Sequence, residues 1–245
     1  MNVKFDHSKN RHSVQGAKTA INAIFGKNIP KSVLDVGCGV GAWLKAFEEL
    51  GVKEIEGVDG VDLPKNQLLI EKSKIKVLDL VQPINLKRKY DLVLCLEVGE
   101  HIEKKHSSTI IDSLTRHGDF ILFSGAIPGQ AGQNHINCQW PSFWQKKFNS
   151  KGFACYDFAR FKIWDEKAIE PWYRQNIFVA KKSKKSGNEN RIISILHPEI
   201  FEQAIICETK IKENIRKGSQ PIHWYVTTAV SALACKIKRK LIKKY

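Results

Sequence analysis

Short apolar segments alternate with amphipathic segments along the first 180 residues of the chain. The run KYDLVLCLEV at 89–98 is nearly continuous in apolar residues, which is typical of a strand buried on both faces of a sheet. Between such runs, apolar residues recur at helical spacing and stop at glycines. The pattern predicts strands at 32–36, 54–59, 75–79, 89–98 and 119–129, and helices at 13–26, 41–50, 107–118 and 142–153.

Two further apolar segments complete the predicted sheet. FARFKIW at 158–164 and NIFVAKK at 176–182 are interpreted as a final antiparallel pair of strands. Because strands and helices alternate, we predict an α/β, Rossmann-like fold with a mostly parallel seven-stranded sheet and helices on both faces. Ligands bind at the carboxyl ends of the strands in such sheets. Four acids at strand ends are therefore expected at one edge of a pocket: Asp35, Asp59, Asp79 and Glu97.

The stretch VLDVGCGVGAWL at 33–44 contains the end of a strand, a glycine turn and the start of a helix. Gly37, Gly39 and Gly41 alternate shortly after Asp35. Glycine adopts backbone angles that other residues avoid, and it leaves room for a ligand against the main chain. The following helix adds unpaired N–H groups and a partial positive charge at its N-terminus. We therefore predict a ligand-binding turn.

Two kinds of cofactor fit this turn. Gly37-x-Gly39-x-x-Ala42 satisfies the dinucleotide fingerprint, and Asp59 lies about twenty residues further on, as a ribose-binding acid would. The same layout suits S-adenosylmethionine. Asp35 favours S-adenosylmethionine, because a carboxylate two residues before the first glycine repels a pyrophosphate and attracts a cationic amino group.

The composition indicates a globular protein of a reducing compartment. A chain of 245 residues with 42% hydrophobic residues is long enough for one full core and an appendage. The six cysteines are scattered, with no C-x-x-C pair and no metal-binding spacing with histidine, so we expect free thiols and a cytoplasmic location. The opening MNVKFDHSKNRHS has no apolar core, so we expect no signal peptide.

The formal net charge of +15 is concentrated in the C-terminal part. From Lys181 onward the chain contains fifteen Lys and Arg residues but only five Asp and Glu residues. Residues 1–180 contain 25 Lys and Arg residues and 20 Asp and Glu residues. The segment KKSKKSGNEN is polar and charged, which is typical of a linker. We therefore predict a first domain at 1–181, a linker at 182–191 and a helical basic extension at 192–245.

The end of this extension has an amphipathic pattern. Residues 222–235 carry no charged side chain, but this run is too short to span a bilayer. Six of the last ten residues are basic. Such a helix can lie on an anionic membrane surface, pack on the domain or a partner subunit, or serve as a solvated basic tail. Five apolar residues share its predicted apolar face: Val226, Val230, Leu233, Ile237 and Leu241.

Several segments together resemble the class I S-adenosylmethionine-dependent methyltransferases. They are VLDVGCGVGAWL, GVDG, LDL and DLVLCLEVGEHI. More narrowly, FSGAIPGQAGQNHINCQWPSFWQKKF, IWDEKAIEPWYRQNIFVA and LHPEIF resemble a bacterial subfamily that often accompanies glycosyltransferases in surface-polysaccharide gene clusters. The resemblance covers about residues 10–205, and the last forty residues resemble no family known to us.

The resemblance implies a role for each cofactor-binding residue. Asp35 and the turn from Gly37 to Gly41 would hold the methionine end, Asp59 would accept the ribose hydroxyls, and Asp79 would meet the adenine amino group. Glu97 would face the sulfonium edge. The whole implied set comprises Asp35, Gly37, Cys38, Gly39, Gly41, Asp59, Gly60, Leu78, Asp79, Leu80 and Glu97.

Methyl transfer to a hydroxyl requires a group that removes the proton of the acceptor. His101 and His135 are the candidate bases, because histidine accepts protons near neutral pH, and Glu100 lies beside the first. Each histidine also has a structural interpretation, in which it only forms hydrogen bonds that hold the strand–helix junction or the loop.

The run Glu97-x-x-Glu100-His101 also resembles the metal-binding E-x-x-E-H of the small-RNA 2′-O-methyltransferases and the quinone-pathway O-methyltransferases. With His135 these residues are candidate ligands of a divalent metal that would bind neighbouring hydroxyls. The second histidine of the RNA enzymes is replaced by Lys104 or Lys105, which argues against this hypothesis.

From the sequence we expect a cytoplasmic methyltransferase that acts on oxygen, either free or peripheral to the inner face of the membrane. The subfamily resemblance implies a sugar, a nucleotide-sugar or another glycan precursor as the acceptor. Three alternatives stay open: an RNA or DNA methyltransferase, a non-catalytic scaffold with this fold, and a small oxidoreductase.

Overall fold

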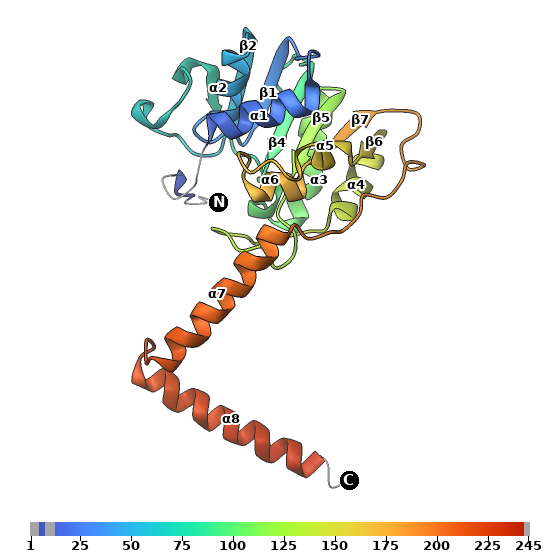
Figure 1. Cartoon of the computed structure of the whole chain (residues 1–245). Coiled ribbons are helices and arrows are strands. Elements are labelled where there is room, and N and C mark those ends of the chain that lie inside the picture. The colour runs from blue at the N-terminus through green and yellow to red at the C-terminus, as the bar shows by residue number, and fades with distance from the viewer. Residues whose placement is uncertain (1–4, 8–12, 243–245) are drawn as a thin grey trace. The chain divides into compact units, whose positions relative to one another are not determined.

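The computed structural model describes residues 5–7 and 13–242, the last six of these by their backbone alone. Its centre is a seven-stranded sheet in the order β3-β2-β1-β4-β5-β7-β6 (Figure 1). All neighbouring pairs are parallel except those of β7, which runs antiparallel to β5 and β6. The strands are β1 (Ser32–Val36), β2 (Glu54–Asp59), β3 (Ile75–Val77), β4 (Leu92–Leu96), β5 (Phe120–Ser124), β6 (Phe153–Tyr156) and β7 (Phe178–Lys182). The predicted fold class is confirmed.

Helices cover both faces of this sheet. On one face, α1, α2 and α5 pack around Leu44, Phe47 and Ile163. On the other face, α3 and α4 pack around Ile110 and Phe148. Both faces of the central strands are therefore apolar, as a parallel sheet requires. The helices of this part are α1 (Val14–Phe25), α2 (Ala42–Glu49), α3 (Ser107–His117), α4 (Pro141–Asn149), α5 (Phe158–Ile163) and α6 (Pro171–Asn176), with short 3₁₀ helices η2 (Lys65–Gln67), η3 (Lys72–Lys74), η4 (Gly99–His101) and η5 (Lys104–His106).

The prediction of a strand at 158–164 is wrong. These residues form α5, and the strand that pairs with β7 is Phe153–Tyr156. The predicted helix at 142–153 ends at Asn149, since Gly152 turns the chain into β6 with a φ of 79°. Phe158 and Phe161 are exposed while Ala159 and Ile163 are buried, which is a helical spacing that the apolar composition concealed.

The first compact unit extends to residue 200, further than predicted. Residues 182–191 do not form a free linker, since Lys182 ends β7 and Oε1 of Glu189 is held by three donors. Glu189 Oε1 accepts hydrogen bonds from Gln145 Nε2 at 2.9 Å, Asn149 Nδ2 at 2.6 Å and the backbone N–H of Cys155 at 3.2 Å. The segment therefore closes the edge of the sheet beside β6.

The second unit comprises residues 201–245. It contains most of α7 (Pro198–Arg216) and all of α8 (Ile222–Ile242), so the extension is helical as predicted. Tyr225 Oη donates a hydrogen bond to the carbonyl of Ile215 at 2.6 Å, which joins the two helices at their connection. Among the described residues, no helix has the length and apolarity that crossing a membrane requires.

Strand order places the candidate site. The chain leaves β1 towards β2 on one side, while β4 continues the sheet on the other side of β1. Ligands of doubly wound sheets bind at such a reversal, beyond the carboxyl ends of the strands. Asp35 on β1 and the residues that follow β4 meet at this point.

Candidate active site

The glycine turn after β1 has the backbone geometry that its sequence predicts. Gly37, Gly39 and Gly41 have φ values of 85°, 53° and 83°, a region that side chains disfavour. A Cβ atom on Gly37 would lie 2.3 Å from a methyl group of Val98, so the turn also packs too closely for any other residue. The turn leads directly into α2, whose first residues Ala42 and Trp43 line a cavity.

That cavity has a volume of about 390 Å³ and lies beyond the ends of β1 and β4. Its size falls within the range of small-molecule sites. The glycine turn and the start of α2 form one wall, the residues after β4 form another, and a loop at 130–135 closes a third side. The residues that line it include Asp35, Gly37, Cys38, Gly39, Glu97, Glu100, His101, Gln130 and His135.

Asp35 provides a buried negative group in the wall of this cavity. Its side chain is only 4% exposed. Burial, together with the nearby carboxylate of Asp59, raises the pKa of Asp35 to about 7. A cationic ligand group beside Asp35 would compensate its buried charge, whereas a phosphate would add to the repulsion.

Asp59 ties the glycine turn to the end of β2. Its Oδ2 accepts a hydrogen bond from the N–H of Gly39 at 2.7 Å, and its Oδ1 accepts one from the N–H of Val61 at 2.9 Å. The Nε2 atom of His7 lies 3.8 Å from Oδ1, so His7 stands between Asp59 and the cavity. The sequence analysis did not single out His7.

The structure does not bring the predicted adenine-contacting residues to the cavity. Asp79 follows β3 at the edge of the sheet, is exposed, and accepts a hydrogen bond from the N–H of Val81 at 3.1 Å. Leu78 is 36% exposed, whereas Leu80 packs against the core. A Cβ atom on Gly60 would lie 3.9 Å from the carbonyl oxygen of Leu78. These four residues therefore lie outside the walls described above.

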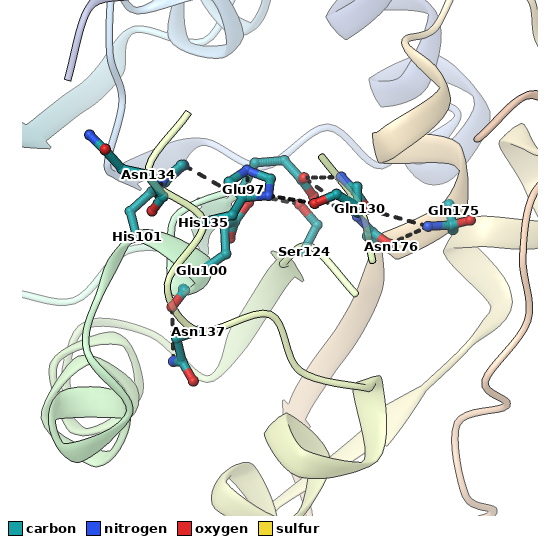
Figure 2. A network of polar contacts seen from close by, with 11 residues as sticks. Glu97, Glu100, His101, Ser124, Gln130, Asn134, His135, Asn137, Gln175 and Asn176 are labelled. Carbon is teal, nitrogen blue, oxygen red and sulfur yellow. Dashed lines mark hydrogen bonds and ion pairs between the residues drawn. The ribbon is translucent and has the colours of Figure 1, made fainter. Parts of the chain in front are cut away.

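Glu97 occupies a strained position at the end of β4. Its φ is 55°, which a residue with a side chain rarely adopts and which is often retained at functional sites. Its carboxylate accepts hydrogen bonds from Asn176 Nδ2 at 3.1 Å and Gln130 Nε2 at 3.2 Å, while its backbone N–H donates to Ser124 Oγ at 3.0 Å (Figure 2). Burial is the main cause that raises the pKa of Glu97 to about 7.

Glu100, His101 and His135 converge on one side of the cavity (Figure 2). Glu100 Oε1 lies 4.0 Å from Nε2 of each histidine, and the ring centroids of the histidines are 5.2 Å apart. The carboxylate of Glu100 is 1% exposed and neither oxygen has a hydrogen-bond partner in the described part of the chain. Burial and the negative charge of Glu97 raise the pKa of Glu100 well above its usual range.

The hydrogen bonds of the two histidines determine which nitrogen carries the proton. His101 Nδ1 lies 3.4 Å from the carbonyl of Asn134, and His135 Nδ1 lies 2.9 Å from the carbonyl of Gln130. A carbonyl can only accept, so Nδ1 of each neutral ring is the donor and Nε2 keeps its lone pair. Burial is the main cause that lowers the pKa of His101 to about 4, so its imidazole is neutral at pH 7.

Backbone contacts hold the loop of His135 against Glu100. The N–H groups of Ile136 and Asn137 both donate to the carbonyl of Glu100, at 2.9 and 3.0 Å. The Asn137 side chain donates to the carbonyl of Gly99 at 3.1 Å. The loop after β5 is thus bonded directly to η4, which brings His135 beside the acidic pair.

The residues present fit a divalent metal. One ligand atom from each of Glu100, His101 and His135 lies within 4.8 Å of the others. Each Nδ1 is fixed by a carbonyl, which is how ligating histidines are usually held, and each Nε2 faces Glu100. A cation would also satisfy the buried oxygens of Glu100. Glu97 is engaged with Asn176 and Gln130, so of the four predicted ligands it fits least well.

Sequence reasoning missed Gln130 and Asn176, which hold Glu97. Asn176 Nδ2 also donates to Gln130 Oε1 at 3.0 Å, so the three side chains form one network (Figure 2). A signal was present, because both residues lie in the segments GQAGQNHIN and WYRQN that carry the subfamily resemblance. Their contact with Glu97 depends on a strand pairing that no local pattern shows.

Comparison with known proteins agrees with this geometry. A family model described as a methyltransferase domain matches residues 9–123. No curated protein matches the chain. Among solved structures, the magnesium protoporphyrin IX methyltransferase ChlM from Synechocystis PCC 6803, solved with bound SAH, is 20% identical, has a TM-score of 0.50, and aligns with 69% of this chain and 84% of its own.

Two further structures share the fold. The sugar N-methyltransferase KedS8 from Streptoalloteichus sp ATCC 53650 is 12% identical with a TM-score of 0.53, over 72% of this chain and 90% of its own. DesVI from Streptomyces venezuelae is 12% identical with a TM-score of 0.53, over 74% of this chain and 100% of its own. The sheet order, the glycine turn with its two acids and the methyltransferase-domain model that matches residues 9–123 together support a class I S-adenosylmethionine-dependent methyltransferase.

Proposed function

We propose that this methyltransferase modifies a hydroxyl group of a sugar, a nucleotide-sugar or another glycan precursor. The observation that carries the proposal is the placement of Glu100, His101 and His135 in the same cavity as the glycine turn. S-adenosylmethionine supplies an activated methyl group when bound. The side chains of the protein must then orient the acceptor oxygen and remove its proton.

The two histidines are suited to bind hydroxyl groups. Nε2 of His101 and of His135 is the unprotonated nitrogen in the neutral rings, and both atoms face the Glu100 carboxyl. His135 is the proposed proton acceptor, because burial lowers the pKa of His101 to about 4 and makes it a weak base. His101 would accept a hydrogen bond from a neighbouring hydroxyl, an arrangement that sugar rings supply. An acceptor amine would require no such pair, since an amine is already nucleophilic when neutral.

Aromatic residues in the lining of the cavity support a planar or sugar-like acceptor. Trp172 and Tyr173 line the cavity, and Tyr173 contacts Trp43 edge-on with 5.3 Å between ring centroids. Aromatic faces are suitable surfaces for the apolar side of a sugar ring. Trp144, by contrast, is only 1% exposed and belongs to the core.

A metal-assisted version of this reaction is supported by the same residues. Glu100, His101 and His135 would hold the ion, which would lower the pKa of a bound hydroxyl. Glu97 would remain a cavity acid held by Asn176 and Gln130. Its negative charge next to the turn would favour the positively charged donor.

A nucleic acid is the second candidate acceptor, and the net charge of +15 favours it. The excess positive charge lies mainly after residue 180, since residues 1–180 carry 25 basic and 20 acidic side chains. The catalytic unit therefore offers little of the charge that would neutralise phosphates. This distribution makes a small acceptor the better supported proposal.

The deciding experiment is an acceptor screen with radiolabelled methyl donor. We expect label in sugars or nucleotide-sugars, as an alkali-stable ether, and none in short RNA or DNA oligonucleotides. The screen is run with and without chelator to test the metal-assisted version. Labelling of oligonucleotides alone, or of amines alone, would contradict the proposed function.

A further inference from the structure

Helix α8 exposes a continuous apolar stripe. Ile222 is 82% exposed, Val226 56%, Val230 63% and Leu233 62%. Their spacing of four, four and three residues places them on one side of the helix. Ile237 and Leu241 would extend the stripe, but their side chains lie outside the described part of the chain. An exposed stripe of this length is a candidate binding surface rather than an ordinary helix face.

The charge of the same segment has a single sign. Residues 222–245 contain six Lys and Arg and no Asp or Glu. The preceding segment 198–217, which contains α7, carries four of each sign, so the excess belongs to the last helix. Trp224 and Tyr225 lie in the first turn of α8, within its uncharged N-terminal part. Aromatic residues of these two types are enriched where apolar and polar phases meet.

We propose that α8 binds the surface of an anionic membrane, with its apolar stripe in the interface and its basic end against the lipid headgroups. A lipid surface fits both features, because amphipathic helices bind through buried apolar area and through attraction to anionic lipids. A nucleic acid would match the charge and leave the aliphatic stripe in water. A second copy would cover the stripe and bring two strongly basic segments together.

The test is sedimentation of the full chain with lipid vesicles. We expect binding to vesicles with 30% phosphatidylglycerol in phosphatidylcholine, little binding to phosphatidylcholine alone, and a loss when salt rises from 50 to 500 mM. The double variant Val226→Glu with Val230→Glu should lower partitioning more than about tenfold. Replacing Lys236, Lys238, Arg239 and Lys240 by glutamine should produce a similar loss.

The matched control is Thr227→Glu with Ser231→Glu. It adds the same charge at the same spacing, one position along the helix and off the stripe, so its binding should fall far less. Helix content by circular dichroism and binding of S-adenosylhomocysteine by the first unit serve as folding controls for every variant. These measurements need no methyl acceptor, so their outcome is independent of the proposed function.

Three results would overturn the proposal. The first is equal binding to neutral and anionic vesicles. The second is an equal loss in both double variants, which would indicate a purely electrostatic contact of the kind that nucleic acids use. The third is a dimer in lipid-free solution that the Val226→Glu, Val230→Glu variant dissociates, with no vesicle binding by the original chain.

Discussion

Glu100 Oε1 lies 4.0 Å from His135 Nε2, although the two residues follow different strands of the sheet. The contact places a buried carboxyl, whose oxygens have no hydrogen-bond partner among the described residues, beside an imidazole whose Nδ1 is bonded to the carbonyl of Gln130. This pair, with His101, distinguishes the acceptor side of the cavity from the side formed by the glycine turn.

Replacing His135 by glutamine should lower kcat by about 10²–10⁴, the usual contribution of a positioned proton acceptor. Binding of S-adenosylhomocysteine should stay within about twofold, since the glycine turn is untouched. Kinetics and calorimetry on the same preparation measure both quantities. His106→Gln is the matched control, because His106 lies in η5 outside the cavity and should retain full activity. Equal activity of both variants would remove His135 from the reaction.

Addition of Mn²⁺ should raise the melting temperature of the protein if Glu100, His101 and His135 bind a metal. At a concentration a hundredfold above Kd, binding contributes about 2.7 kcal/mol to the stability of the folded state. Glu100→Gln should abolish the shift, whereas Glu103→Gln, at a half-buried acid nearby that pairs with Lys105 instead, should leave it intact. The same shift in both variants, measured by differential scanning fluorimetry, would show that the metal binds elsewhere.

Replacing Asp59 by alanine should abolish binding of S-adenosylhomocysteine while the protein stays folded. The substitution removes the acceptor of the Gly39 and Val61 amides, so a decrease in stability of about 1–3 kcal/mol per unsatisfied group is expected as well. Asp79→Ala is the comparison variant. Because Asp79 is exposed, this substitution should lower the affinity for S-adenosylhomocysteine by less than tenfold. Retained binding in the Asp59 variant, seen by calorimetry, would contradict the ribose assignment.

Binding of S-adenosylhomocysteine should weaken as the pH falls below 7. The pKa of Asp35 is raised to about 7, so acidification protonates the carboxylate that would hold the cationic amino group. One proton taken up per molecule weakens affinity by at most tenfold per pH unit. Titration calorimetry from pH 5.5 to 8.5 measures this slope. In the Asp35→Asn variant the affinity for S-adenosylhomocysteine should be low over this whole pH range. The part of its pH dependence that comes from Asp35 should be absent.

The same shift predicts that Asp35→Asn raises stability at pH 8. Because the pKa of Asp35 in the folded protein exceeds its usual value, its contribution is favourable at low pH and is lost as the pH rises through 7. Removing the buried charge should therefore raise the melting temperature by about 2–4 °C for each kcal/mol recovered. An Asp35→Asn variant whose melting temperature equals that of the original protein at both pH 8 and pH 5 would show that the charge of Asp35 does not destabilise the fold.

Replacing Gly37 by alanine should destabilise the protein by more than about 2 kcal/mol, because the new Cβ would meet Val98 at 2.3 Å in addition to the backbone strain. Gly129→Ala is the matched control. Gly129 has a similar φ of 87° with open space around it, so only the backbone cost of about 1–2 kcal/mol remains. Chemical denaturation of both variants separates the two causes, and equal losses would show that the contact with Val98 is easily relieved.

Local sequence patterns determined the cofactor side of the molecule. β1, the glycine turn and β2 lie where they were predicted, because strand periodicity, glycine spacing and the acid at the strand end are all short-range features. The mostly parallel sheet followed from the alternation of elements, but only the second member of the predicted antiparallel pair, at 176–182, contains a strand. The segment 158–164 was misassigned, because an apolar run of this length fits a strand or a short helix equally well.

Only the tertiary structure decided the acceptor side. His135 reaches Glu100 because its loop donates two backbone hydrogen bonds to η4, and Asn176 reaches Glu97 from 79 residues away. The tertiary structure also places His7 next to Asp59 and leaves Asp79 outside the cavity. Such contacts depend on which strands pair and how loops pack across the sheet edge. Residue spacing along the chain does not predict these distances. The sequence therefore determined which chemical groups are present, and the fold determined which of them come into contact.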